Sequence, residues 1–217
     1  MKINTKPLPG MMELLPEEQL EFDRIYEVIR KNYEKFGFAP IDTPIIERTE
    51  TLLAKAGGET EKQIYRFSKG DNDLSLRFDL TVPTARFVAE NFGQLQFPFK
   101  RSQIGKVYRG ERAQRGRFRE FYQCDADIVG SDSLLNEVEL IQIIDTVFTK
   151  FGIRVQIKIN NRKILTGIAE VIGEQEKIIQ ITTAIDKLDK IGLEAVNEEL
   201  EKEMQQAASA LDFEGAA

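Results

Sequence analysis

The stretch YRGERAQRGRFREFYQCDAD, residues 108 to 127, places five arginines within eleven positions and then becomes aromatic and acidic. Residues 100 to 109 and 117 to 129 are predicted to form two strands joined by this arginine-rich turn. Between Lys100 and Glu120 there are eight Lys or Arg and two Glu, although the 217-residue chain carries a formal net charge of -6. Such a local excess of positive charge indicates either a solvated strand face or a basic groove for a phosphate ligand.

Side chains alternate between the two faces of a strand, and this sorts the second strand into two groups. One face carries cations, a ring, an amide and carboxylates: Arg117, Arg119, Phe121, Gln123, Asp125 and Asp127. The other face is mainly apolar, and we predict that Tyr122, Cys124 and Ile128 pack in the core. Arginine suits phosphate oxygens, a flat ring suits a base, and carboxylates with an amide suit a cationic small molecule. The combination points to a nucleotide together with an amino acid.

The first strand and an upstream segment extend this face. Arg109 shares its side of the strand with Gln103 and Gly105, and the glycine would let a ligand approach the sheet closely. In the segment LRFDLT, three further residues stand at every second position and would lie on one face of a strand: Arg77, Asp79 and Thr81. Both assignments require that no bulge interrupts the strands.

Hydrophobic periodicity and breaker residues predict the remaining elements. Proline keeps the extended segment FAPIDTPII, which begins at residue 38, at a sheet edge or in an interface. Short strands are predicted within residues 63 to 79, around a turn at 69 to 73. A further strand is predicted at 155 to 159, and helices are predicted at 17–36, 84–92, 133–151, 161–172 and about 175–188.

Composition excludes several classes of protein. No apolar run approaches the roughly 20 residues of a membrane helix, and the N-terminus lacks the apolar core of a signal peptide. The single cysteine excludes an internal disulfide and fits a cytosolic chain. The absence of histidine excludes histidine-based acid–base catalysis and, with one cysteine, disfavours a zinc site. Catalysis must therefore depend on Arg, Lys, carboxylates, hydroxyls and the backbone.

The arginine-rich stretch also carries a family resemblance. Residues 99 to 130, FKRSQIGKVYRGERAQRGRFREFYQCDADIVG, closely resemble the second signature motif of class II aminoacyl-tRNA synthetases, in the form found in histidyl-tRNA synthetases. FAPIDTPIIERTE (38 to 50) resembles the first motif, and LRFDLTVPTAR (76 to 86) resembles the segment that helps to bind ATP and histidine. INNRKIL (159 to 165) and IDKLDKIG (185 to 192) are similar to the same family. The resemblance implies an α+β fold, an antiparallel sheet flanked by helices.

The same resemblance implies a function and residue roles. A histidine–tRNA ligase would use ATP and Mg²⁺ to convert L-histidine to histidyl-adenylate and would then charge tRNA(His), as a cytoplasmic homodimer joined through the first motif. Arg109 would act catalytically on the α-phosphate. ATP would be bound by Arg109, Glu111, Arg117 and Phe121. Histidine would be bound by Asp79, Thr81, Gln123 and Asp127, and no side chain is assigned to a metal.

The sequence departs from the family pattern in three places. Ala113 stands where the motif usually has proline, and the N-terminal segment lacks an RGxxD-like string. The second histidine-specific segment, the third motif and an anticodon-binding domain are not visible. We therefore expect an incomplete catalytic core: residues 1–190 as the N-terminal part of the catalytic domain, and 191–217 as an acidic helical tail that starts a following segment.

Such a chain is expected to activate histidine poorly or not at all by itself. Two alternatives remain open. The chain can be a histidyl synthetase-like regulatory subunit of ATP phosphoribosyltransferase, or a general RNA-binding module that contacts phosphates through the basic hairpin.

Overall fold

A computed structural model describes residues 3–54, 59–112 and 114–214, which fall into two compact units, Met1–Gln156 and Ile157–Ala217. The first unit contains both β-sheets, and the second contains only helices and their connections. The division follows Gln156, whereas the sequence suggested a boundary near residue 190 for the end of the catalytic-domain part. The extent of that domain stays a prediction.

The arginine-rich stretch closes a long antiparallel hairpin, formed by β5 (Phe99–Tyr108) and β6 (Glu120–Val129). The two strands pair without interruption from Phe99↔Val129 to Tyr108↔Glu120. No bulge breaks the register, so the predicted alternation holds from residue 120 to 129. Arg117 and Arg119 lie before the strand, so strand parity does not apply to them.

Proline fixes the strand at one edge of this sheet. β1 (Ala39–Pro40) pairs in parallel with β5, and the strand order is β1-β5-β6. This confirms the predicted edge position. Proline has no N–H, and at the edge of a sheet its absence costs no inter-strand hydrogen bond. The sheet is mixed because β1 runs parallel to β5. The expected α+β class is confirmed.

A second, smaller sheet is wholly antiparallel. Its order is β2 (Ile46–Arg48), β4 (Asn72–Leu76) and β3 (Arg66–Lys69). β3 and β4 form the hairpin that was predicted around residues 69 to 73. Two short helices, α2 (Thr49–Leu53) and α3 (Glu59–Gln63), lie between β2 and β3 in the chain.

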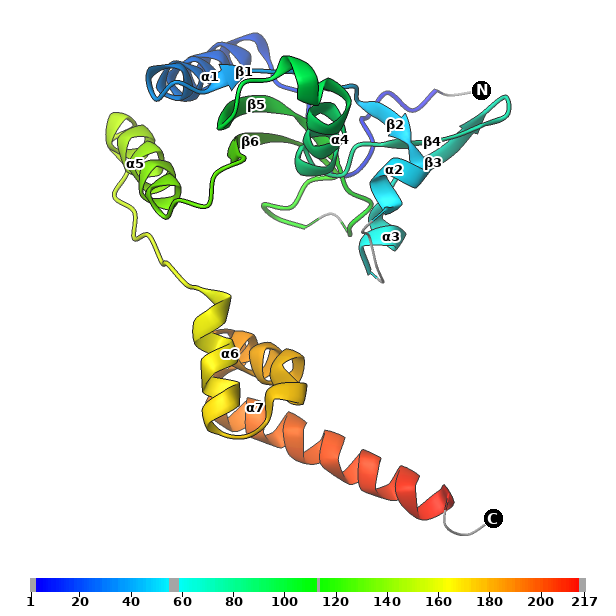
Figure 1. Ribbon diagram of the computed structural model, residues 1–217. Helices are drawn as coiled ribbons and strands as arrows, with labels where there is room; N and C mark the ends of the chain where they lie inside the picture. Colours follow the sequence, from blue (N-terminus) through cyan, green and yellow to red (C-terminus); the bar gives the residue numbers. More distant parts are fainter. Residues whose placement is uncertain (1–2, 55–58, 113, 215–217) are drawn as a thin grey trace. The chain divides into compact units, whose positions relative to one another are not determined.

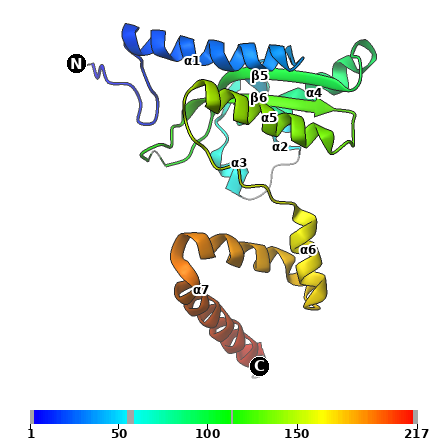
Figure 2. The same cartoon turned by 90° about the vertical axis from the view of Figure 1, so that its left-hand side faces the viewer.

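Two long helices cover one face of the β5–β6 hairpin. α1 (Pro16–Lys35) and α5 (Leu135–Lys150) lie on that side, and α4 (Thr81–Asn91) lies on the other (Figures 1 and 2). A short 3-10 helix, Phe92–Gln94, continues α4. The core cluster consists of Tyr33, Phe38, Ile143 and Val147. Ile128 packs against this cluster, as predicted.

Two residues assigned to the core are exposed instead. Tyr122 is 42% exposed, and Cys124 is also exposed. The core cluster packs against Ala126 and Ile128, near the C-terminal end of β6. Tyr33 forms a hydrogen bond with the backbone carbonyl of Cys124 and not with its side chain. The alternation of faces was right, but α1 and α5 do not cover the whole length of that face.

Two element predictions need correction. Residues 155 to 159 form no strand, because a strand requires a hydrogen-bonded neighbour and no described residue pairs with this segment. The helix predicted from Thr84 begins at Thr81. Proline suits the first turn of a helix, where its missing N–H has no partner to lose, and Pro83 occupies that turn.

The second unit consists of α6 (Arg162–Val171), a 3-10 turn (Gln175–Lys177) and α7 (Ile178–Glu214). α6 lies close to the helix predicted at 161–172, and the first part of α7 corresponds to the helix predicted at about 175–188. α7 changes direction at Gly192, whose φ of 80° and ψ of 167° are not helical. The acidic tail is helical as far as Glu214.

The buried tyrosine of α1 gives a pH-dependent prediction. Burial raises the pKa of the Tyr33 phenol well above its ordinary value of 10.0, and its hydroxyl donates a 3.0 Å hydrogen bond to the Cys124 carbonyl. We expect Tyr33→Phe to cost about 1 kcal/mol at pH 7. The unfolded chain ionises first, so this advantage of the native tyrosine is full below pH 10 and declines above it.

Urea unfolding of both proteins at pH 7, 9 and 11, followed by circular dichroism, measures this difference. An advantage of equal size at pH 9 and 11 would contradict the prediction.

Candidate functional site

The four residues predicted to bind ATP surround one cavity. It measures about 290 Å³ and lies between the end of β5, the hairpin turn and the start of β6. Its lining residues are Arg109, Glu111, Gly116, Arg117, Phe118 and Phe121. The fold therefore brings together two guanidinium groups, a carboxylate and an aromatic ring.

Arg109 is held at this cavity by two aromatic rings. Its guanidinium carbon lies 4.4 Å from the centre of the Phe78 ring and 5.1 Å from that of Phe121. Its Nε donates a 3.2 Å hydrogen bond to the Phe78 carbonyl. Among the described residues, its terminal nitrogens make no hydrogen bond or ion pair. They remain available for an oxyanion.

The turn of the hairpin is fixed by backbone and side-chain contacts. Gln114 and Arg117 exchange backbone hydrogen bonds of 3.2 and 3.0 Å, and Gly116 between them has a φ of +79° that favours glycine. The Arg117 guanidinium lies 3.4 Å from the Glu111 carboxylate. Arg119 donates from Nε to the Glu111 carbonyl at 2.8 Å. Ala113, the departure from the family motif, lies outside the described residues.

The acidic end of β6 contains a buried ionic cluster. Arg101 is fully buried and lies opposite Asp127 in the strand register. Its Nη2 contacts Asp127 Oδ2 and lies 3.6 Å from Asp125 Oδ2. Burial raises the pKa of Asp125, whereas Arg101 and a hydrogen bond from Gln123 act in the opposite direction. The cluster places carboxylates where they can meet a cationic group.

Asp79 and Thr81 lie at the start of α4. The Asp79 carboxylate accepts a 3.0 Å hydrogen bond from the Val82 N–H, which fixes its position, and it raises the pKa of Asp125. Asp79 therefore belongs to the same acidic region. Thr81 is exposed as the first residue of the helix. Because β4 ends at Leu76, strand parity does not relate these residues to Arg77.

The space above Gly105 is occupied by a side chain of the protein itself. A Cβ at this position would lie 2.5 Å from Arg77 Nη2, so any larger residue would force the Arg77 guanidinium to move. Arg77 is 3% exposed and donates to the carbonyls of Lys106 at 2.7 Å and Thr43 at 2.6 Å. The expectation that Gly105 leaves room for a ligand is wrong, because Arg77 fills that room.

Gln103, expected on the ligand side of β5, is also buried. Its amide donates to Asp42 Oδ1 at 2.9 Å and to the Thr43 hydroxyl at 3.1 Å. Gln103 and Arg77 therefore fasten residues 42–43 to the sheet. The middle of this face is closed by packing, and its two ends carry the basic cavity and the acidic cluster.

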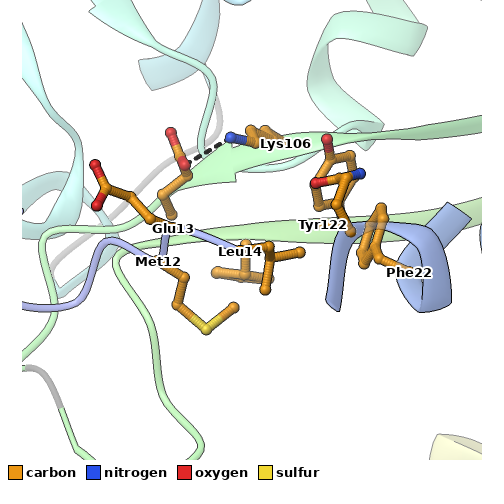
Figure 3. A pocket seen from close by; sticks show the side chains of 9 residues that line it. Met12, Glu13, Leu14, Phe22, Lys106 and Tyr122 are labelled. Atoms are coloured by element: carbon orange, nitrogen blue, oxygen red, sulfur yellow. Dashed lines mark hydrogen bonds and ion pairs between the residues drawn. The ribbon is translucent and has the colours of Figure 1, made fainter. Parts of the chain in front are cut away.

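A larger cavity of about 530 Å³ lies between the N-terminal segment, α1 and the hairpin (Figure 3). Met12 and Leu14 line it together with Phe22 and Tyr122, whose ring centres are 4.7 Å apart. Lys106 and Glu120 also line the cavity and form a 2.7 Å ion pair, drawn as a dashed line. Of the predicted ligand-binding residues, only Phe121 lines this cavity. Tyr122 faces this space rather than the core.

Three residues of the site were missed in the sequence: Phe78, Arg77 as a packing residue, and Arg101. The antiparallel pairing of the two strands would have placed Arg101 opposite Asp127, so a signal existed for that residue. Phe78 and Arg77 contact the hairpin through long-range packing, and no local pattern indicates this.

Two kinds of feature are absent from the described residues. They contain no group of three or more His, Cys, Asp or Glu side chains arranged to hold a metal ion. None of their helices is both long enough and apolar enough to cross a membrane.

Sequence comparison relates the chain to known proteins. A family model described as histidyl-tRNA synthetase matches residues 10–217. The histidine–tRNA ligase of Clostridium tetani is 56% identical over 198 residues, which cover 90% of this chain and 45% of that protein. The corresponding ligase of Bacteroides fragilis is 52% identical over 214 residues, which cover 88% and 47%. The chain spans about half the length of the curated relatives it matches.

Solved structures give the same relationship. The crystal structure of histidyl-tRNA synthetase from Nostoc sp. PCC 7120 matches with a TM-score of 0.79 at 38% identity, over 98% of this chain and 49% of that one. A structure described as an ATP phosphoribosyltransferase regulatory subunit/histidyl-tRNA synthetase from Bacillus halodurans C matches with a TM-score of 0.61 at 26% identity, over 70% and 39%.

Proposed function

Because the chain belongs to the histidyl-tRNA synthetase family, we propose that its β5–β6 face binds ATP and L-histidine as part of a histidine–tRNA ligase. The observation that supports this most strongly is the single cavity shared by Arg109, Glu111, Arg117 and Phe121. A planar cation, a ring and a carboxylate at one place fit the phosphate, base and ribose of a nucleotide. The acidic cluster fits the ammonium group of an amino acid.

In this proposal, a carboxylate oxygen of histidine attacks the α-phosphorus of ATP, and the bond to pyrophosphate breaks. Negative charge builds up on the phosphoryl oxygens, and the free guanidinium nitrogens of Arg109 stabilise it there. Asp127, Gln123 and Asp79 hold the ammonium group, with Thr81 beside them, and so orient the attacking carboxylate. A terminal ribose hydroxyl of tRNA(His) then attacks the acyl carbon of histidyl-adenylate and gives up its proton, and the bond from that carbon to the phosphate oxygen breaks to release AMP.

Magnesium enters this proposal with the nucleotide. Mg²⁺ keeps several waters and is commonly bound through substrate phosphates plus one or two carboxylates. This suits a site without a dedicated cluster of metal ligands among the described residues. When bound, the ion would neutralise part of the triphosphate charge, and Glu111 is the carboxylate that lines the cavity.

Histidine-dependent exchange of pyrophosphate into ATP tests the proposal. We expect slow exchange by this chain, dependent on Mg²⁺ and on histidine, that disappears in Arg109→Ala. Exchange of equal rate with other amino acids, or exchange that survives in the variant, would argue against the site. A rate equal to that of a full-length relative would instead overturn only the expectation that the chain alone is a poor catalyst.

The regulatory-subunit alternative has some support from the Bacillus halodurans structure, whose description includes that role. A subunit that only senses histidine has no need of a nucleotide cavity, whereas this chain keeps all four residues expected to bind ATP. We therefore favour the ligase. Histidine binding without any measurable ATP binding would reverse this preference.

We also propose a cytoplasmic homodimer joined through the first-motif segment, residues 38 to 50. Large apolar side chains are exposed there, Ile45 at 42% and Ile46 at 50%. Burying such side chains between two copies would contribute favourably to association. Sedimentation equilibrium measures the oligomeric state directly. A chain that stays monomeric over a 100-fold range of protein concentration would contradict the proposal.

A further inference from the structure

Arg101 is a fully buried cation whose only ionic partners among the described residues are two carboxylates of β6. None of its three guanidinium nitrogens makes a hydrogen bond of regular geometry with a described residue. Its contacts are ionic, to Asp127 Oδ2 and, at 3.6 Å, to Asp125 Oδ2. Removing a guanidinium from water is costly, and an apolar side chain in such a place often stabilises a fold at least as well. This ion pair therefore suggests a role beyond packing.

The cluster divides the Asp127 carboxylate into an inner and an outer oxygen. Oδ2 is buried against Arg101, yet the Asp127 side chain is 42% exposed. The exposure therefore belongs to the rest of the side chain, including Oδ1. Asp125 is only 14% exposed, so it faces Arg101 rather than a ligand. Arg101 fixes the inner oxygen of Asp127 and leaves the outer one free to accept a hydrogen bond.

We infer that Arg101 is a positioning residue, which holds Asp127 so that its outer oxygen accepts an N–H of the ammonium group of the amino-acid ligand. The inference rests on the proposed function and deepens it. Asp125 completes this arrangement, because its carboxylate lies 3.6 Å from Arg101 Nη2 and offsets part of the Arg101 charge. Neither Arg101 nor Asp125 touches the ligand in this arrangement.

If Arg101 positions Asp127, then removing Arg101 should weaken histidine binding, whereas simple electrostatics predicts tighter binding. Two carboxylates, Asp125 and Asp127, lie beside the Arg101 guanidinium, and Asp79 adds negative charge that acts on Asp125. Removing the positive charge makes the region more negative, which by Coulomb attraction alone would tighten the binding of an ammonium ion. Positioning requires the reverse, because a released Asp127 no longer presents its outer oxygen in a fixed geometry.

Arg101→Met tests this in the whole chain, with L-histidine and ATP titrated separately and binding followed by NMR into the millimolar range. We expect histidine affinity to fall about tenfold or more and ATP affinity to change less than about twofold. Arg101→Lys should recover part of the histidine affinity, since lysine keeps the charge without the planar fork. Lys100→Met is the matched control, because Lys100 forms its ion pair with Glu139 on α5.

Arg101→Met leaves two carboxylates facing each other, which can impair folding. The double variant Arg101→Met/Asp125→Asn removes one of these charges, and the same loss of histidine affinity is expected in it. Histidine binding equal to or tighter than that of the native chain in the double variant would overturn the inference and leave the proposed function intact.

An equal loss of ATP and histidine affinity in both Arg101 variants would show a structural role and would also overturn the inference. Absence of histidine binding by the native chain would overturn the proposed function, and the inference with it.

Discussion

Replacing Arg109 with alanine is expected to weaken ATP binding about 100-fold. The side chain places a guanidinium between the rings of Phe78 and Phe121, and its terminal nitrogens remain free for phosphate oxygens. A hydrogen bond to a charged group contributes about 1.5–3 kcal/mol, and 1.4 kcal/mol corresponds to a factor of ten. Calorimetric titration with ATP and Mg²⁺ measures the loss.

The control for this variant comes from the same turn. Arg112 is exposed and does not line the cavity, so Arg112→Ala removes an equal charge at a short distance. We expect it to change ATP affinity less than about threefold, because an exposed charge is screened by solvent and salt. Equal losses in both variants would mean that only the general positive charge of the hairpin matters, which is the behaviour of a non-specific phosphate-binding surface.

The second large effect concerns stability. Arg77→Met is expected to lower the unfolding free energy of the first unit by about 3 kcal/mol. Arg77 is 3% exposed, fills the space above Gly105 and donates to the carbonyls of Lys106 and Thr43. Methionine fills much of the volume but donates no hydrogen bond, so both carbonyls lose a donor.

Tyrosine fluorescence during urea unfolding measures this change selectively. All five tyrosines precede residue 157, and the chain has no tryptophan, so the signal reports the first unit. Arg66→Met is the matched control, since Arg66 pairs with Asp73 on the exposed face of the smaller sheet. Little change is expected for it. A loss at Arg77 no larger than at Arg66 would show that residues 42–43 and 77 do not brace the hairpin.

The sequence was most informative where the relevant interactions are local. Alternation along one strand and a turn rich in Arg and Gly are enough to predict β5, β6 and the shared face of the residues from Phe121 to Asp127. The periodic apolar residues of α1 and α5 likewise predict helices close to the observed Pro16–Lys35 and Leu135–Lys150. The family resemblance then related Arg109, Glu111, Arg117 and Phe121, which the structure places around one cavity.

Local patterns failed where the outcome depends on distant partners. Which part of the apolar face of β6 is covered depends on where α1 and α5 cross it, so Tyr122 and Cys124 could not be distinguished from Ile128. The segment from 155 to 159 has a strand composition but no neighbouring strand among the described residues. The space at Gly105 is taken by Arg77, a residue 28 positions away in the chain.

Backbone NMR of the isotope-labelled chain, recorded before and after each ligand is added, tests the central claim most directly. ATP with Mg²⁺ should shift the amides of Arg109, Glu111 and Phe121, and L-histidine should shift those of Asp79, Gln123 and Asp127. Shifts confined to residues 157–214, or no shifts on β6 with either ligand at millimolar concentration, would contradict the claim that this hairpin face binds both substrates.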